Sequence, residues 1–156
     1  MRRFVVAAAI AVAALALPAL GLAKGPSAAT ISGPGLEGSI AITGQGEGGP
    51  GSPLGTLVDS GGFFAQTFGQ TPDLTLKRRP AGTLGPRYKV VYEVPGPNSI
   101  KSRLVQFIYP YAKPGPLTYM KTGQRFWVSR RAHGGWYRAS ESLMTMLVEL
   151  GLPARA

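Results

Sequence analysis

Two stretches of alternating sequence, separated by a short run of turn-forming residues, constrain the fold most. Between residues 87 and 94, apolar side chains alternate with mostly polar ones, and residues 100–109 form a second extended stretch. The intervening residues 95–99 include two prolines, a glycine and an asparagine, a composition typical of a turn. The pattern predicts a β-hairpin with one buried face and one exposed face.

The expected register follows from pairing apolar residues on one face and opposite charges on the other. A shift of one residue would move the buried side chains into water, so the hydrophobic pattern favours a single set of faces. The expected pairs are Val94 with Ile100, Tyr92 with Ser102, Val90 with Leu104, Glu93 with Lys101 and Val91 with Arg103.

Further short strands are expected on both sides of this hairpin. Residues 28–32 and 36–43 could form a hairpin of their own or join the edge of the main sheet, and the sequence leaves both arrangements open. Residues 117–120 and 124–128 are expected to form a second hairpin around 121–123, and 136–138 a last strand. The sheet is therefore expected to be antiparallel.

Two helices are expected to accompany the sheet. Ser52 is a suitable N-cap for a short helix near 53–61, and Phe64 and Phe68 could share a face of a further turn. Ser140 is expected to cap a C-terminal helix with one apolar stripe. The sequence thus predicts an α+β fold, an antiparallel sheet of about four to six strands with one face covered by the C-terminal helix.

The chain divides into three expected parts. Residues 1–23 have the positive start, the apolar run and the small residues of a signal peptide, with cleavage expected after Ala23. An uncleaved anchor is the alternative, but the apolar run is short and Pro18 interrupts it. Residues 24–53 hold short strands and a Gly/Pro-rich loop, and residues 54–156 form the core. We therefore expect a secreted bacterial protein without a stable membrane span.

The charge balance of the chain favours an anionic partner. Of 17 Lys and Arg, Arg2 and Arg3 leave with the signal peptide, so 15 cations remain against 7 acids, a net charge of +8. Such a charge attracts anionic envelope polymers or acidic partner proteins, with no specific nucleic acid implied. A solvated basic surface without a dedicated partner is the alternative, because the charges are spread along the chain.

Chemically reactive groups are few. The chain has no cysteine and one histidine, His133, which lies in a loop beside two arginines and two glycines. No nucleophile elbow or metal-ligand pattern occurs. The glycines at 44, 46 and 49 match a dinucleotide motif, but Pro50 prevents the helix that such a site needs. We expect no catalytic residue, no metal and no cofactor, and the residues favour a non-enzymatic protein.

Candidate binding residues come from the exposed face of the hairpin, where cations alternate with aromatic residues. Such a mixed face suits an anionic polymer or a sugar ring, unless the helix that begins at Ser140 or the N-terminal segment covers it. The candidate ligand-binding residues are Arg87, Lys89, Lys101 and Arg103, with Arg130, Arg131 and Trp136 as a second group.

The segments 109–120 and 133–138 resemble uncharacterised small secreted proteins of actinobacteria, a resemblance that implies bacterial export and no activity. Taken with the residues, the favoured function is a secreted, non-enzymatic protein of the bacterial envelope or medium that binds an anionic polymer. Two alternatives remain open. One is a protein-binding module or inhibitor of an extracellular enzyme, which inserts the loop 95–99 or the corner 110–116. The other is a hydrolase that uses His133.

Overall fold

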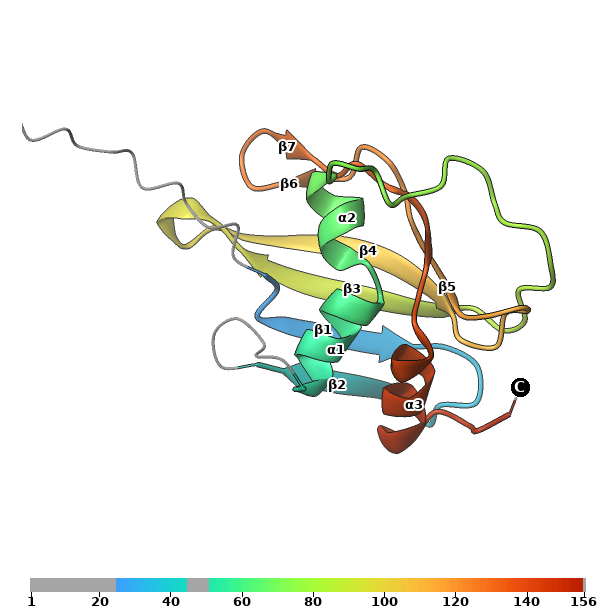
Figure 1. Cartoon of the computed structure of the whole chain (residues 1–156). Coiled ribbons are helices and arrows are strands. Elements are labelled where there is room, and N and C mark those ends of the chain that lie inside the picture. Colours follow the sequence, from blue (N-terminus) through green and yellow to red (C-terminus); the bar gives the residue numbers. More distant parts are fainter. Residues whose placement is uncertain (1–24, 45–50, 156) are drawn as a thin grey trace, which may run out of the picture.

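The computed structural model describes residues 25–44 and 51–155, which form a six-stranded antiparallel sheet with three helices packed on one of its faces (Figure 1). The fold is α+β, as the sequence predicts. The expected signal peptide and residues 45–50 of the Gly/Pro-rich loop lie outside the described residues. Within the described part, no helix is long and apolar enough to span a bilayer.

The strand order of the sheet is β2-β1-β3-β4-β5-β8. The N-terminal strands do both things that the sequence left open, since β1 pairs with β2 as a hairpin and with β3 of the main sheet. The six strands are β1 (Ala28–Ser32), β2 (Ser39–Thr43), β3 (Tyr88–Pro95), β4 (Lys101–Tyr109), β5 (Leu117–Met120) and β8 (Gly135–Arg138).

The central hairpin of β3 and β4 is present, but its register differs from the predicted one by two residues. Val94 pairs with Ser102, not Ile100, and Glu93 lies opposite Arg103. The reason is that the turn is centred one residue later than expected, on Asn98, which takes a left-handed conformation within a short 3₁₀ segment, η1 (Pro97–Ser99). A shift of two residues keeps every side chain on its predicted face, because successive side chains of a strand alternate.

The second predicted hairpin is wrong. Strand β5 pairs with β4 and β8, and residues 124–128 do not pair with it. Instead a separate two-stranded ribbon forms from β6 (Arg125–Phe126) and β7 (Arg130–Arg131). The side-chain amide of Gln124 explains where the chain leaves the sheet, because it bonds both the N–H and the carbonyl of Val105 and so occupies the edge of β4 in place of a strand.

The three helices are α1 (Pro53–Ser60), α2 (Phe63–Phe68) and α3 (Glu141–Glu149). The predicted cap of α1 is confirmed, since the Ser52 hydroxyl accepts the N–H of Gly55 at 3.0 Å. Ser140 occupies the N-cap position of α3, but its hydroxyl bonds Ser142 and does not cap the helix. The apolar stripe of α3 is buried against the sheet, so the C-terminal helix covers one face as predicted.

A buried hydrogen-bond network joins the helical layer to the sheet. Gln106 on β4 donates to the carbonyl of Gly61 and to Gln66 of α2, and accepts from the hydroxyl of Tyr92 on β3. Thr118 on β5 donates to the same Gly61 carbonyl at 2.8 Å. The four side chains of this network, Tyr92, Gln106, Gln66 and Thr118, are fully buried. A satisfied network of this kind fixes one arrangement of layers, because each unpaired partner would be costly.

We expect Gln106→Leu to destabilise the fold by about 3 kcal/mol, because the change leaves the buried Tyr92 hydroxyl without a partner and removes the bonds of Gln106 to the Gly61 carbonyl and to Gln66. Urea unfolding followed by circular dichroism measures the change. The matched control is Gln70→Leu, which replaces an exposed glutamine and should alter stability by less than about 0.5 kcal/mol. Equal stability of the two variants would contradict the role given to the network.

Stability should also fall at alkaline pH. Burial raises the pKa of Tyr92 above its ordinary value of 10.0, so the unfolded chain loses the phenolic proton first. The contribution of Tyr92 to the free energy of unfolding is complete below pH 10 and declines above it by up to about 1.4 kcal/mol per pH unit. Tyr92→Phe should remove this part of the decline in urea unfolding between pH 9 and 11. An unchanged slope would show that Tyr92 is accessible to water.

Candidate functional site

The face of the sheet opposite the helices, called here the outer face, carries the candidate binding residues. The helices lie in front of the sheet in Figure 1 and pack on the inner face, where Tyr88, Val90 and Tyr92 are buried. On the outer face of the same strand, Lys89 is exposed. The possibility that α3 roofs over this face is therefore wrong, because α3 packs on the other side.

A row of side chains crosses the outer face from strand to strand. Ser32 pairs with Lys89, Lys89 with Phe107, Phe107 with Tyr119, and Tyr119 with Trp136. Paired residues of an antiparallel sheet place their side chains on the same face. The three rings are all partly exposed, and the Tyr119 and Trp136 centroids are 4.8 Å apart. We call Phe107, Tyr119 and Trp136 the aromatic platform.

Cations border this platform at one end. The guanidinium of Arg87 lies over the ring of Phe107, 4.7 Å from its centroid, which holds the cation close to the ring by a cation–π interaction. At the opposite end of β3 and β4, Lys101 forms the predicted ion pair with Glu93 at 3.7 Å, although the two residues are diagonal and not directly paired. Arg103 lies opposite the same Glu93 and is exposed.

The structure divides the second predicted group. Trp136 belongs to the platform through its contact with Tyr119. Arg130 and Arg131 lie in β7, in the separate two-stranded ribbon. Tyr119 was not predicted as a platform residue, although its place two residues after Leu117 on the same face of one strand was a usable signal.

His133 anchors a loop and does not complete a catalytic triad. Its Nε2 lies 3.1 Å from the Asp73 carboxylate and 3.2 Å from the Thr75 hydroxyl. A triad needs the acid on one ring nitrogen and the nucleophile on the other, whereas here both groups meet the same nitrogen. Hydrogen bonds from the backbone N–H and the hydroxyl of Thr75, and then the contact with His133, hold the pKa of Asp73 below its ordinary 3.8.

Among residues 25–44 and 51–155, no group of three acidic or histidine side chains is placed to hold a metal ion.

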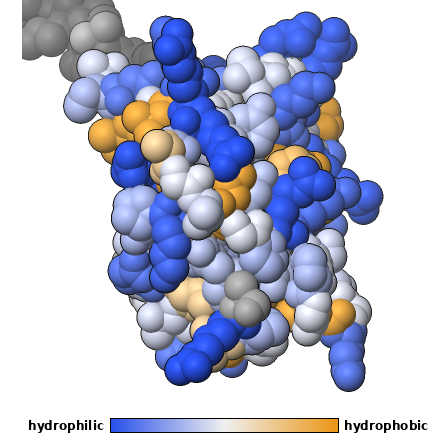
Figure 2. Space-filling model, turned by 90° about the vertical axis from the view of Figure 1, so that its right-hand side faces the viewer, coloured by the Kyte–Doolittle hydropathy of each residue, from blue (hydrophilic) through white to orange (hydrophobic). Residues whose placement is uncertain are grey.

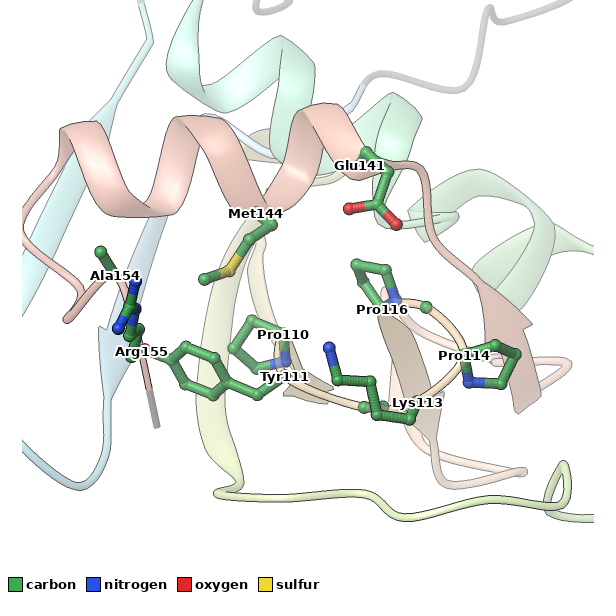
Figure 3. A pocket seen from close by; sticks show the side chains of 11 residues that line it. Pro110, Tyr111, Lys113, Pro114, Pro116, Glu141, Met144, Ala154 and Arg155 are labelled. Atoms are coloured by element: carbon green, nitrogen blue, oxygen red, sulfur yellow. The ribbon is translucent and has the colours of Figure 1, made fainter.

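A pocket of about 330 Å³ lies between the proline-rich corner 110–116 and α3 (Figure 3). The Glu141 carboxylate and the Lys113 ammonium point into it from opposite sides. They are not within ion-pair distance of each other. Burial, with the neighbouring Tyr88 hydroxyl, raises the pKa of Tyr111 in its wall to about 12, so the phenol stays neutral. The pocket suits a small polar ligand with groups of both charges.

The side of the molecule seen at the right of Figure 1 is mainly polar. Figure 2 shows hydrophilic side chains over most of it, with hydrophobic atoms in small separate patches. This side therefore offers a partner charged and polar groups and no single broad apolar surface, which would be the usual mark of a protein-docking site.

The chain matches no protein family model, no curated protein and no solved structure.

We expect Asp73→Ala to loosen the loop that follows α2. The change removes the contacts of Asp73 with Thr75 and His133, each of which has a net value of roughly 0.5–1.5 kcal/mol. Trypsin should then cut after Lys77 or Arg78 about three- to tenfold faster. Asp59→Ala, which replaces another exposed acid, is the control. Wild-type cleavage rates in Asp73→Ala would mean that the His133 cluster does not anchor the loop.

Proposed function

We propose that this chain is an exported, non-enzymatic binding protein of the bacterial envelope or medium that holds an anionic, sugar-containing polymer on the outer face of its sheet. The observation that supports this most is the aromatic platform. Phe107, Tyr119 and Trp136 are adjacent on three neighbouring strands and partly exposed. Rings placed in a row suit the faces of consecutive rings of a polymer.

The cations around the platform supply the affinity for negative charge. Lys89 extends the row on one side, and Arg87 is held over Phe107. Across the described residues only two ion pairs form, Lys101 with Glu93 and His133 with Asp73, so Arg87 and Lys89 have no carboxylate partner there. Lys101 and Arg103 continue the positive surface toward the other end of β4. Carboxylate, sulfate or phosphate groups on a polymer can bind these side chains.

The polar pocket beside α3 and the His133 cluster give less support for the two alternatives. The corner 110–116 forms a wall of the pocket, so its residues border a hollow, whereas an inhibitor loop of this kind projects into its target. The His133 cluster lacks a nucleophile on the second ring nitrogen. Neither site places an activated group beside the aromatic platform.

The charge part of the proposal predicts that Arg87→Glu combined with Lys89→Glu weakens binding to an acidic polysaccharide by about 100-fold at low salt, since two attractions become two repulsions. Retention on immobilised heparin and fluorescence titration with alginate measure the loss. The control is Lys77→Glu combined with Arg78→Glu, which changes the net charge equally in an exposed loop. Equal loss in both double variants would show that only net charge matters.

The aromatic part of the proposal predicts a separate loss of affinity. Trp136→Leu keeps an apolar side chain but removes the ring. It should weaken binding to the same polymers by about tenfold, since each stacked ring contributes roughly 1–2 kcal/mol. Affinity for a polyanion without rings, such as polyphosphate, should change by less than twofold. Equal affinities of wild type and Trp136→Leu for alginate would remove the platform from the binding site.

A further inference from the structure

We propose that the ribbon of β6 and β7 docks the protein onto an anionic lipid surface. This inference goes beyond the polymer proposal and is independent of it, because it rests on a different surface. The residues of this surface, called here the arginine tip, are Arg125, Trp127, Val128, Arg130 and Arg131.

The most exposed large hydrophobic residue of the described chain lies at the arginine tip. Val128 is 81% exposed, whereas Leu74, the next most exposed, is at 51%. Single exposed apolar residues are common, so the exposure gains meaning only from what surrounds Val128. Three exposed arginines flank it within the same ribbon.

Two of the three arginines are placed where they repel each other, while the Arg130 guanidinium lies over the Phe68 ring, 6.0 Å from its centroid. Arg125 and Arg131 are directly paired across the ribbon, and like charges in that position destabilise a hairpin. Within the part of the chain that the structure describes, none of the three has a carboxylate within 4 Å. An anionic surface would relieve this repulsion, since lipid phosphates can bind each guanidinium.

Packing and hydrogen bonds fix the base of the arginine tip, so Val128 is held in its exposed position. Phe126 is buried, with its ring packed against Phe68 and Trp127. The Trp127 indole N–H donates to the carbonyl of Pro95 at 3.0 Å, and its backbone N–H donates to the Ser102 hydroxyl. Trp127 itself has a φ of 50°, a conformation that bulky residues rarely adopt. It reverses the chain just before Val128.

The position of the tip also fits a membrane. Through Trp127 it adjoins the turn between β3 and β4, where Ile100 is 38% exposed and Lys101 adds a cation. Figure 1 shows the ribbon and this turn at the same end of the sheet.

Together these features match a peripheral membrane site. An apolar side chain enters the interface, the half-buried indole lies at headgroup depth, and cations around them bind anionic headgroups. Each cation near such a surface adds about fivefold to the binding constant, and the valine about tenfold.

Because the chain has no cysteine, one substitution gives a single labelling site. The protein is expressed from Met1, and the form that the cell produces is purified with Val128→Cys carrying an environment-sensitive nitrobenzoxadiazole dye. On vesicles of phosphatidylglycerol and phosphatidylcholine the emission should shift to the blue and be quenched by a lipid-borne quencher. On phosphatidylcholine alone it should not. The control label, at Leu74→Cys, should stay in water on both kinds of vesicle, even if another segment of the protein binds them.

Affinity provides the second arm. In vesicle sedimentation, Val128→Asp should weaken binding to the anionic vesicles at least tenfold, and Leu74→Asp less than twofold. Arg87→Glu combined with Lys89→Glu should lower alginate binding but leave the dye response at position 128 intact. A dye at position 128 that remains in water, or equal losses in Val128→Asp and Leu74→Asp, overturns the proposal. If adding alginate to the anionic vesicles abolished the response of the dye at position 128, the arginines would be assigned to a polymer. That result would overturn the membrane proposal as well.

Discussion

The buried hydrogen bonds of Gln106 determine on which side of the sheet the helices lie. One amide group binds the Gly61 carbonyl, the Gln66 side chain and the Tyr92 hydroxyl, and thereby joins the sheet to the junction of α1 and α2. The junction can approach because Gly62 has no side chain, and a Cβ there would lie 2.4 Å from the ring of Tyr137. With the helices fixed on the inner face, no helix covers the outer face. There Tyr109 and Leu117 are buried beside Leu84, while Phe107, Tyr119 and Trp136 stay partly exposed.

That asymmetry accounts for the aromatic platform, whereas the arginine tip has a separate origin. On the outer face the pleat places Phe107, Tyr119 and Trp136 in one row, and the packing of the helices does not use them. The ribbon of β6 and β7 exists because the Gln124 side chain, and not a strand, occupies the edge of β4. The freed segment then folds back on itself and carries its arginines away from the sheet. The polymer and membrane proposals thus use two surfaces that follow from separate features of the same layer.

The sequence predicted the elements better than their partners. Alternation at 87–94 and the Ser52–Pro53 signal identified β3 and α1, since both depend on local preferences. The register of β3 and β4 was missed by two residues because the turn is centred on left-handed Asn98 and not on Pro97. The pairing of β5 with β8 was missed because it depends on contacts between distant residues. Gln106 looked like any polar strand residue, and nothing local shows that it is buried. For the site, the parity of Arg87, Lys89 and Phe107 was predictable, whereas the addition of Tyr119 and Trp136 required the strand order.

The central claim is that the outer face is open and binds through its rings, and hydroxyl-radical footprinting with mass spectrometry tests it most directly. Trp136 and Tyr137 are neighbours in β8 that point to opposite faces and are both partly exposed. Tyr137 is therefore an internal control. Saturation with an acidic polysaccharide should slow oxidation of Trp136 and Tyr119 severalfold and leave Tyr137 unchanged. Equal protection of Trp136 and Tyr137, or protection of neither, would contradict the account.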